Sequence, residues 1–108
     1  MRDIKLYVSD ILGFIQQIED NLGSEAQFLA SKNREDIVVF NLEKIGEALG
    51  QMVLHFQEFS EDETIKDFIG LRNIVIHKYF DVDYKLVWKI AENDLPALKT
   101  RIKSIAPK

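Results

Sequence analysis

The chain has 108 residues, a formal net charge of −4 and no cysteine. This length is typical of one domain, residues 1–108, that can bury its own core. The composition excludes disulfides and thiolate metal sites, and it disfavours wholesale binding of nucleic-acid phosphates. We expect a cytoplasmic protein, because the sequence shows neither a membrane-spanning apolar run nor a secretory signal pattern.

Two long helices are expected from apolar residues at heptad spacing. Residues 2–22 carry one such row, and residues 33–59 carry a second row with the same 4-3-4-3-4 spacing. Between them, Ser24 and Gln27 form a capping-box pattern that opens a short helix. Asn33 is expected to cap the second long helix. The rows are Ile4, Val8, Ile11, Ile15, Ile18 and Leu22, followed by Val38, Leu42, Ile45, Leu49, Met52 and Phe56.

Gly46 and Gly50 lie one turn apart inside the second long helix, and Glu47 lies between them. Two helical glycines cost about 2 kcal/mol relative to alanine. A close approach by another helix or by a second subunit would explain both of them.

A third long helix is expected to begin at Ser60, which forms a capping-box pattern with Glu63. Arg72 lies in the middle of this helix's apolar arc, and a buried guanidinium needs a partner. Two interpretations stay open: a structural arginine paired with a carboxylate such as Glu47, or a functional arginine that faces a cleft or another chain. The arc consists of Ile65, Phe68, Ile69, Val75, Ile76 and Tyr79.

The last helical segment follows Asp81 and Asp83, either of which could cap it. Asp94 and Pro96 predict a kink or a restart within this segment. No run has strand periodicity. The sequence therefore predicts an all-α, up-and-down bundle of four longer helices and one short helix.

Few residues remain that could carry chemistry. His55 and His77 lie on different helices, and no metal-binding pair, phosphate-binding glycine loop or Ser-His-Asp set is present in the sequence. The remaining candidates follow one another on the third long helix: Arg72, Asn73, His77 and Tyr79.

Residues 72–79 read Arg-Asn-Ile-Val-Ile-His-Lys-Tyr, which matches an Arg-x4-His-x-Tyr motif. In this motif the chain resembles the HepT-like toxins of the HEPN superfamily of helical RNases. Residues 45–48 are similar to that family's Ile-Gly-Glu-Ala segment, and residues 79–80, 87–90 and 94–98 are similar to its C-terminal segment. The resemblance therefore covers nearly the whole chain.

The resemblance implies a metal-independent endoribonuclease toxin that needs no cofactor and acts as a homodimer. Arg72 and His77 would be its catalytic residues, with Asn73 in support, and the motifs of two subunits would face each other across a cleft. The expected partner is a nucleotidyltransferase antitoxin called MntA. In the family it transfers AMP from ATP to the motif tyrosine, here Tyr79, and so blocks RNA cleavage.

Elementary chemistry agrees with this resemblance. RNA is cut without a metal when its own 2′-OH attacks the adjacent phosphate, and histidine is the side chain that titrates near neutral pH and can act as the base. Arg72 offers a fork of donors to the phosphorane oxygens. Tyr79 lies two turns from Arg72 on the same face, so a bulky, negative AMP group there would cover or neutralise the arginine.

Arg72 and His77 differ by roughly 140° around an ideal helix and cannot converge on one phosphate from a straight one. Either the helix loosens near His77, or a partner subunit completes the site. A dimer cleft would also give Gly46 and Gly50 a reason to be small, with Glu47 beside them. Two other hypotheses remain: a non-catalytic helical module that docks a nucleotidyltransferase, and a structural dimeric bundle.

Overall fold

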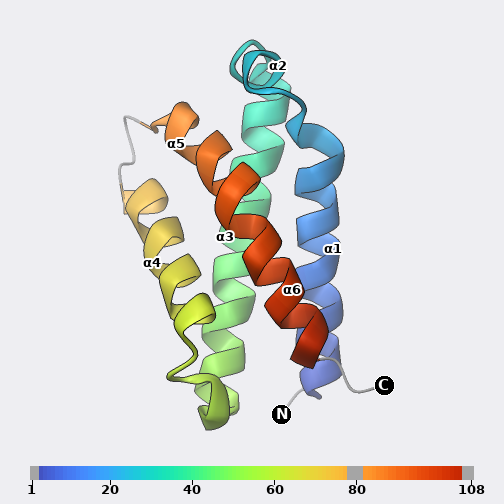
Figure 1. The fold of residues 1–108 in the computed structure, drawn as a ribbon, viewed down its shortest axis with the longest axis vertical. Helices are drawn as coiled ribbons and strands as arrows, with labels where there is room; N and C mark the ends of the chain where they lie inside the picture. Colours follow the sequence, from blue (N-terminus) through green and yellow to red (C-terminus); the bar gives the residue numbers. More distant parts are fainter. Residues whose placement is uncertain (1–2, 78–81, 106–108) are drawn as a thin grey trace.

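The computed structural model describes the backbone of residues 3–77 and 82–105 and the side chains of residues 3–73 and 82–105. All regular secondary structure in these residues is helical, which confirms the predicted all-α bundle (Figure 1). None of the helices in this part of the chain is both long and apolar enough to cross a membrane.

Helices α1 (Ile4–Leu22) and α3 (Lys32–His55) form the central pair, and each packs more extensively against the other than against any other helix. Their predicted heptad rows make up most of this contact. All members of both rows are buried except Ile4 and Phe56, which are partly buried at the edge of the core. The two apolar stripes thus bring α1 and α3 together, as expected for helices with this spacing.

The turn between α1 and α3 holds the short helix α2 (Glu25–Leu29). Gly23, with φ 66°, ends α1 in a conformation that favours glycine. The predicted capping box is confirmed, since the Gln27 N–H donates to Ser24 Oγ (3.2 Å) and the Ser24 N–H donates to Gln27 Oε1 (3.0 Å). The prediction that Asn33 caps α3 is wrong. Ser31 is the cap, and its Oγ accepts from the backbone N–H of Arg34 (3.2 Å).

Helix α3 ends at His55 and is followed by a 3-10 turn, η1 (Gln57–Phe59), and by α4 (Glu63–His77). The predicted Ser60 cap of α4 is also wrong, because the Ser60 hydroxyl donates to the carbonyl oxygen of Gln57 (2.7 Å). Asp62 takes its place and accepts from the backbone N–H of Ile65 (3.1 Å). Asp62 also pairs with Arg101, so the start of α4 is tied to the far end of the chain.

The C-terminal run begins after Asp83, whose carboxylate accepts from the Leu86 N–H (3.1 Å). It consists of α5 (Tyr84–Lys89), a π-helical turn η2 (Ile90–Asp94) and α6 (Leu95–Ile105). The predicted irregularity before Pro96 is therefore a wide turn within a continuous run, and Asp94 lies inside this turn instead of capping a new helix. Asp81 lies outside the described residues.

Figure 1 shows the α5–α6 run crossing the face of the α1–α3 pair, while α4 lies along the other edge of α3. Helix α4 touches both α3 and α6. Its buried residues Ile65 and Phe68 fasten its first half to the core. The motif residues follow on the second half of the same helix.

Candidate functional site on helix α4

Arg72 lies on the core-facing line of α4, two turns after the buried Ile65. Its side chain is half-buried and reaches across to α3. The guanidinium lies against Gly46, where a Cβ atom would come within 2.6 Å of Nη2 and would also overlap Nε and Cζ. The close approach that two glycines in α3 suggested is thus, at Gly46, an approach by an arginine of the same chain.

The charge of Arg72 has no counter-ion within the described part of the chain. None of the ion pairs found there includes Arg72, and its Nε is buried without a hydrogen-bond partner. The expected structural partner, Glu47, is largely exposed and pairs with Lys44 at 3.7 Å. The interpretation of Arg72 as an arginine satisfied by Glu47 is therefore wrong.

The structure describes the rest of the motif only in part. Asn73 is half-buried next to Arg72. The side chain of His77 and the whole of Tyr79 lie outside the described residues. The backbone of α4 stays α-helical as far as His77, so the helix does not loosen before this residue, and the offset of roughly 140° between Arg72 and His77 persists.

Gly50 and Leu54 continue the line of Gly46 along α3, each one turn after the previous residue. A Cβ atom at Gly50 would meet nothing within 4 Å. Leu54 is 61% exposed, one of the few large apolar side chains that remain outside the core among the described residues. The sequence analysis did not single out Leu54. Its position one turn after Gly50 and outside the heptad row could have identified it as an apolar residue that faces away from the core.

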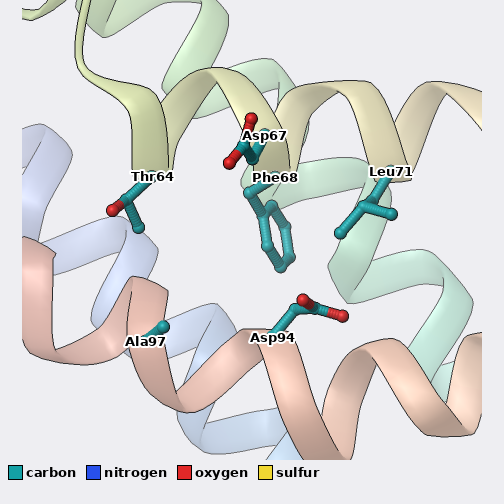
Figure 2. Close-up of a pocket in the computed structure, with 6 residues that line it drawn as sticks. All are labelled: Thr64, Asp67, Phe68, Leu71, Asp94 and Ala97. Atoms are coloured by element: carbon teal, nitrogen blue, oxygen red, sulfur yellow. The ribbon is translucent and has the colours of Figure 1, made fainter.

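Of the cavities that the described residues form, two lie on helices that carry candidate residues, and neither is lined by Arg72. One, of about 200 Å³, lies between α1 and α3 and is lined by Lys44, Glu47, Ala48 and their neighbours on α1. The second, of about 130 Å³, lies on the side of α4 that faces α6. Figure 2 shows Asp67 and Asp94 on opposite sides of this second cavity, and two carboxylates disfavour a phosphate there. Neither cavity brings the motif residues together.

The chain is similar to proteins named as ribonucleases over most of its length. The family described as Ribonuclease HepT-like matches residues 8–105. A putative RNase of Methanocaldococcus jannaschii is 36% identical, with 96% of this chain and 97% of that protein covered. A protein named probable ribonuclease HepT, from Thermococcus cleftensis, is 30% identical, with 96% of each chain covered.

Another relative is longer. A protein of Methanocaldococcus jannaschii named gamma-glutamylcyclotransferase and putative RNase is 37% identical over 96% of this chain, and the chain spans 48% of its length. No solved structure gave a significant match.

Proposed function

Because the chain belongs to the HepT-like ribonuclease family of the HEPN superfamily, we propose that it is an endoribonuclease and the toxin of a toxin–antitoxin system. The observation that supports this proposal beyond family membership is that no described side chain pairs with the charge of Arg72. In a chain with net charge −4, this arginine has no carboxylate partner among the described side chains. Its guanidinium offers a planar fork of donors that suits a phosphate of RNA.

The proposed reaction uses the RNA's own nucleophile. The 2′-oxygen forms a bond to the adjacent phosphorus while His77 takes the proton of the 2′-OH. The bond from phosphorus to the 5′-oxygen breaks, and that oxygen takes a proton from water and leaves as a 5′-OH. Arg72 stabilises the charge on the phosphorane oxygens. Asn73, one turn before His77, orients the base or binds the RNA.

A second copy of the chain is proposed to complete the site. Since the backbone of α4 is α-helical through His77, positions 72 and 77 lie roughly 140° apart around its axis. The unfilled space at Gly50 and the exposed Leu54 lie on the line of α3 that continues from Gly46, and they offer a small-residue and apolar surface for that copy. Leu54→Glu should therefore convert a dimer to a monomer in sedimentation analysis, whereas the same change at Leu6, another exposed leucine, should not.

The proposed antitoxin is an MntA-type nucleotidyltransferase that transfers AMP from ATP to the hydroxyl of Tyr79 and releases pyrophosphate. The added group is bulky and negative, and it would compete with RNA for Arg72. Co-expression with such an enzyme should add multiples of the AMP mass in intact-protein mass spectrometry. A Tyr79→Phe chain that still gains this mass would place the modification elsewhere.

The ribonuclease is tested with purified, unmodified protein and single-stranded RNA in EDTA. Cleavage should leave 2′,3′-cyclic phosphate and 5′-OH ends, and DNA of the same sequence should stay intact because it lacks the 2′-OH. Cleavage that requires a divalent cation, or cleavage of DNA, would contradict the mechanism. A protein that cuts no RNA but binds a nucleotidyltransferase would instead be a non-catalytic docking module.

A further inference from the structure

The structure places the guanidinium of Arg72 in the space that a side chain at Gly46 would occupy. A Cβ atom there would lie 2.5 Å from Cζ and 2.6 Å from Nη2, whereas ordinary van der Waals contacts of Cβ atoms are 3.4–4 Å. The Nε–Cζ–Nη2 side of the group thus packs directly on the backbone of α3. Arg72 and Gly46 are 26 positions apart in the chain, and the contact joins α4 to α3.

No polar interaction in the described part of the chain accounts for this position of Arg72. Its Nε is the one buried side-chain polar atom there that lacks a hydrogen-bond partner. A buried donor without an acceptor is unfavourable, and such groups need a reason. The position is therefore set by shape, that is, by the room that the missing side chain of Gly46 leaves.

Gly46 differs in this respect from the other helical glycines. A Cβ atom at Gly13, Gly50 or Gly70 would meet nothing within 4 Å. Each of these glycines could become alanine without displacing a neighbour. Among the helical glycines of the described residues, only Gly46 has a side chain of the same protein in this space.

We propose that Gly46 is a positioning residue, which seats the Nε side of the Arg72 guanidinium on α3 and so directs its terminal amino groups towards the scissile phosphate. This inference rests on the proposed ribonuclease activity. A guanidinium that is held from one side keeps a fixed orientation, and displacement of a reacting group by about 1 Å can cost roughly 10²-fold in rate. Gly46 itself does not touch RNA in this proposal, because it acts only through Arg72.

The test compares Gly46→Ala with Gly13→Ala, an exposed helical glycine on α1 that serves as the matched control. We expect Gly46→Ala to lower kcat for RNA cleavage by about 10- to 100-fold, because the methyl group displaces the guanidinium. Gly13→Ala should cleave RNA within about twofold of the wild-type rate, in line with a change at an exposed position of another helix. A Gly46→Ala chain that cleaves as fast as the wild type would refute the inference.

Thermal stability gives a second test that needs no RNA. Alanine normally stabilises a helix relative to glycine, and a gain of this size raises the Tm of a small domain by roughly 3–8 °C. We expect that gain for Gly13→Ala in every background, but for Gly46→Ala only when Arg72 is also alanine. If Gly46→Ala alone fails to fold, its rescue by Arg72→Ala would support the same contact.

The two measurements separate the possible failures. Gly46→Ala that lowers the Tm equally with and without the Arg72 side chain would show that Gly46 is small for another reason, and the inference would fall. Suppose that the wild type cuts no RNA, but Gly46→Ala raises the Tm only when Arg72 is also alanine. This result would refute the ribonuclease and still support the seating of Arg72 on Gly46.

Discussion

Helix α4 has one arginine contact just before its first residue and another in its second half, and the two arginines differ in how they are held. Near its start, Arg101 of α6 donates from Nε to Asp62 Oδ2 (2.6 Å), and its guanidinium lies 5.9 Å from the centre of the Phe59 ring. In its second half, Arg72 has a buried Nε that finds no hydrogen-bond partner among the described residues, and its guanidinium lies on Gly46. Arg101 is paired with a carboxylate of its own chain, whereas Arg72 is held in place and no described carboxylate neutralises it.

This difference separates a structural charge from a functional one. The Asp62–Arg101 pair caps a helix and joins two elements, so its energy is used in folding. An arginine already neutralised by a carboxylate would bind a phosphate less well, because the carboxylate would compete with it. Substitutions at the start of α4 should therefore change stability, and substitutions at its end should change activity.

The largest effect is expected at His77, in the last turn of α4. His77→Ala should lower kcat/KM for RNA cleavage by roughly 10²- to 10⁴-fold, because a positioned base contributes that much. The matched control is His55→Gln, since His55 is an exposed histidine at the end of α3. Equal losses for the two histidines, measured with purified protein on the same RNA, would show that His77 is not the base.

The next largest effect is expected when each of the two arginines is replaced by alanine in turn. Arg72→Ala should reduce cleavage by roughly 10²- to 10³-fold. Its Tm should stay within a few degrees of the wild type, because the change also removes an unpaired buried donor. Arg101→Ala should do the reverse and lower the Tm with little change in the cleavage rate. A Tm loss at Arg72 as large as that at Arg101 would contradict the distinction between the two halves.

Asp62→Ala should cost about 2 kcal/mol of unfolding free energy, because α4 loses its cap and Arg101 loses its partner. For a domain of this size, each kcal/mol corresponds to a fall of roughly 4–8 °C in Tm. Asp67→Ala, which removes an exposed carboxylate from the same helix, should stay within about 0.5 kcal/mol in urea unfolding. Similar losses for both variants would show that the Asp62 contacts contribute little.

The smallest expected effect is a change in how the folding stability depends on pH. Burial alone would raise the pKa of Asp62, but hydrogen bonds from Arg101 and from the Ile65 N–H prevail and hold that pKa below its ordinary value of 3.8. The folded state therefore gains stability from the ionised carboxylate above pH 3.8, and it loses this gain as the pH falls through the lowered pKa. The stability difference between wild type and Asp62→Asn should narrow over that acidic range. A difference that stays constant with pH would contradict this account.

Local patterns in the sequence were enough to predict most of the bundle. The heptad rows of α1 and α3 and the Ser24 capping box involve neighbours within one or two turns, so spacing alone identifies them. The two incorrect caps, Asn33 and Ser60, show the limit of this approach. Ser60 matches a capping pattern as well as many real caps do. Asp62 prevails because Arg101, 39 residues away, also binds its carboxylate.

The candidate site, too, could be predicted from the sequence only in part. The apolar arc around Arg72, and the need of this arginine for a partner, could be recognised from the sequence. The actual neighbour, Gly46, could not be paired with it, because the contact depends on how α3 and α4 pack. The expected partner Glu47 is adjacent to Gly46 in sequence but points elsewhere, since successive helical residues are turned by about 100°.

The π-helical turn η2 contains one more residue than a regular helical turn, and this extra residue is what allows a proline at position 96. Pro96, two positions after this turn, has no backbone N–H, and in a regular α-helix its ring would press against the carbonyl of Glu92. Deleting Asn93, an exposed residue, would convert the wide turn into an ordinary one while leaving Leu98 and Ile102 facing the core. A chain without Asn93 should therefore fold well only when Pro96 is also replaced. We expect relatives that lack one residue in this turn to have another residue in place of Pro96.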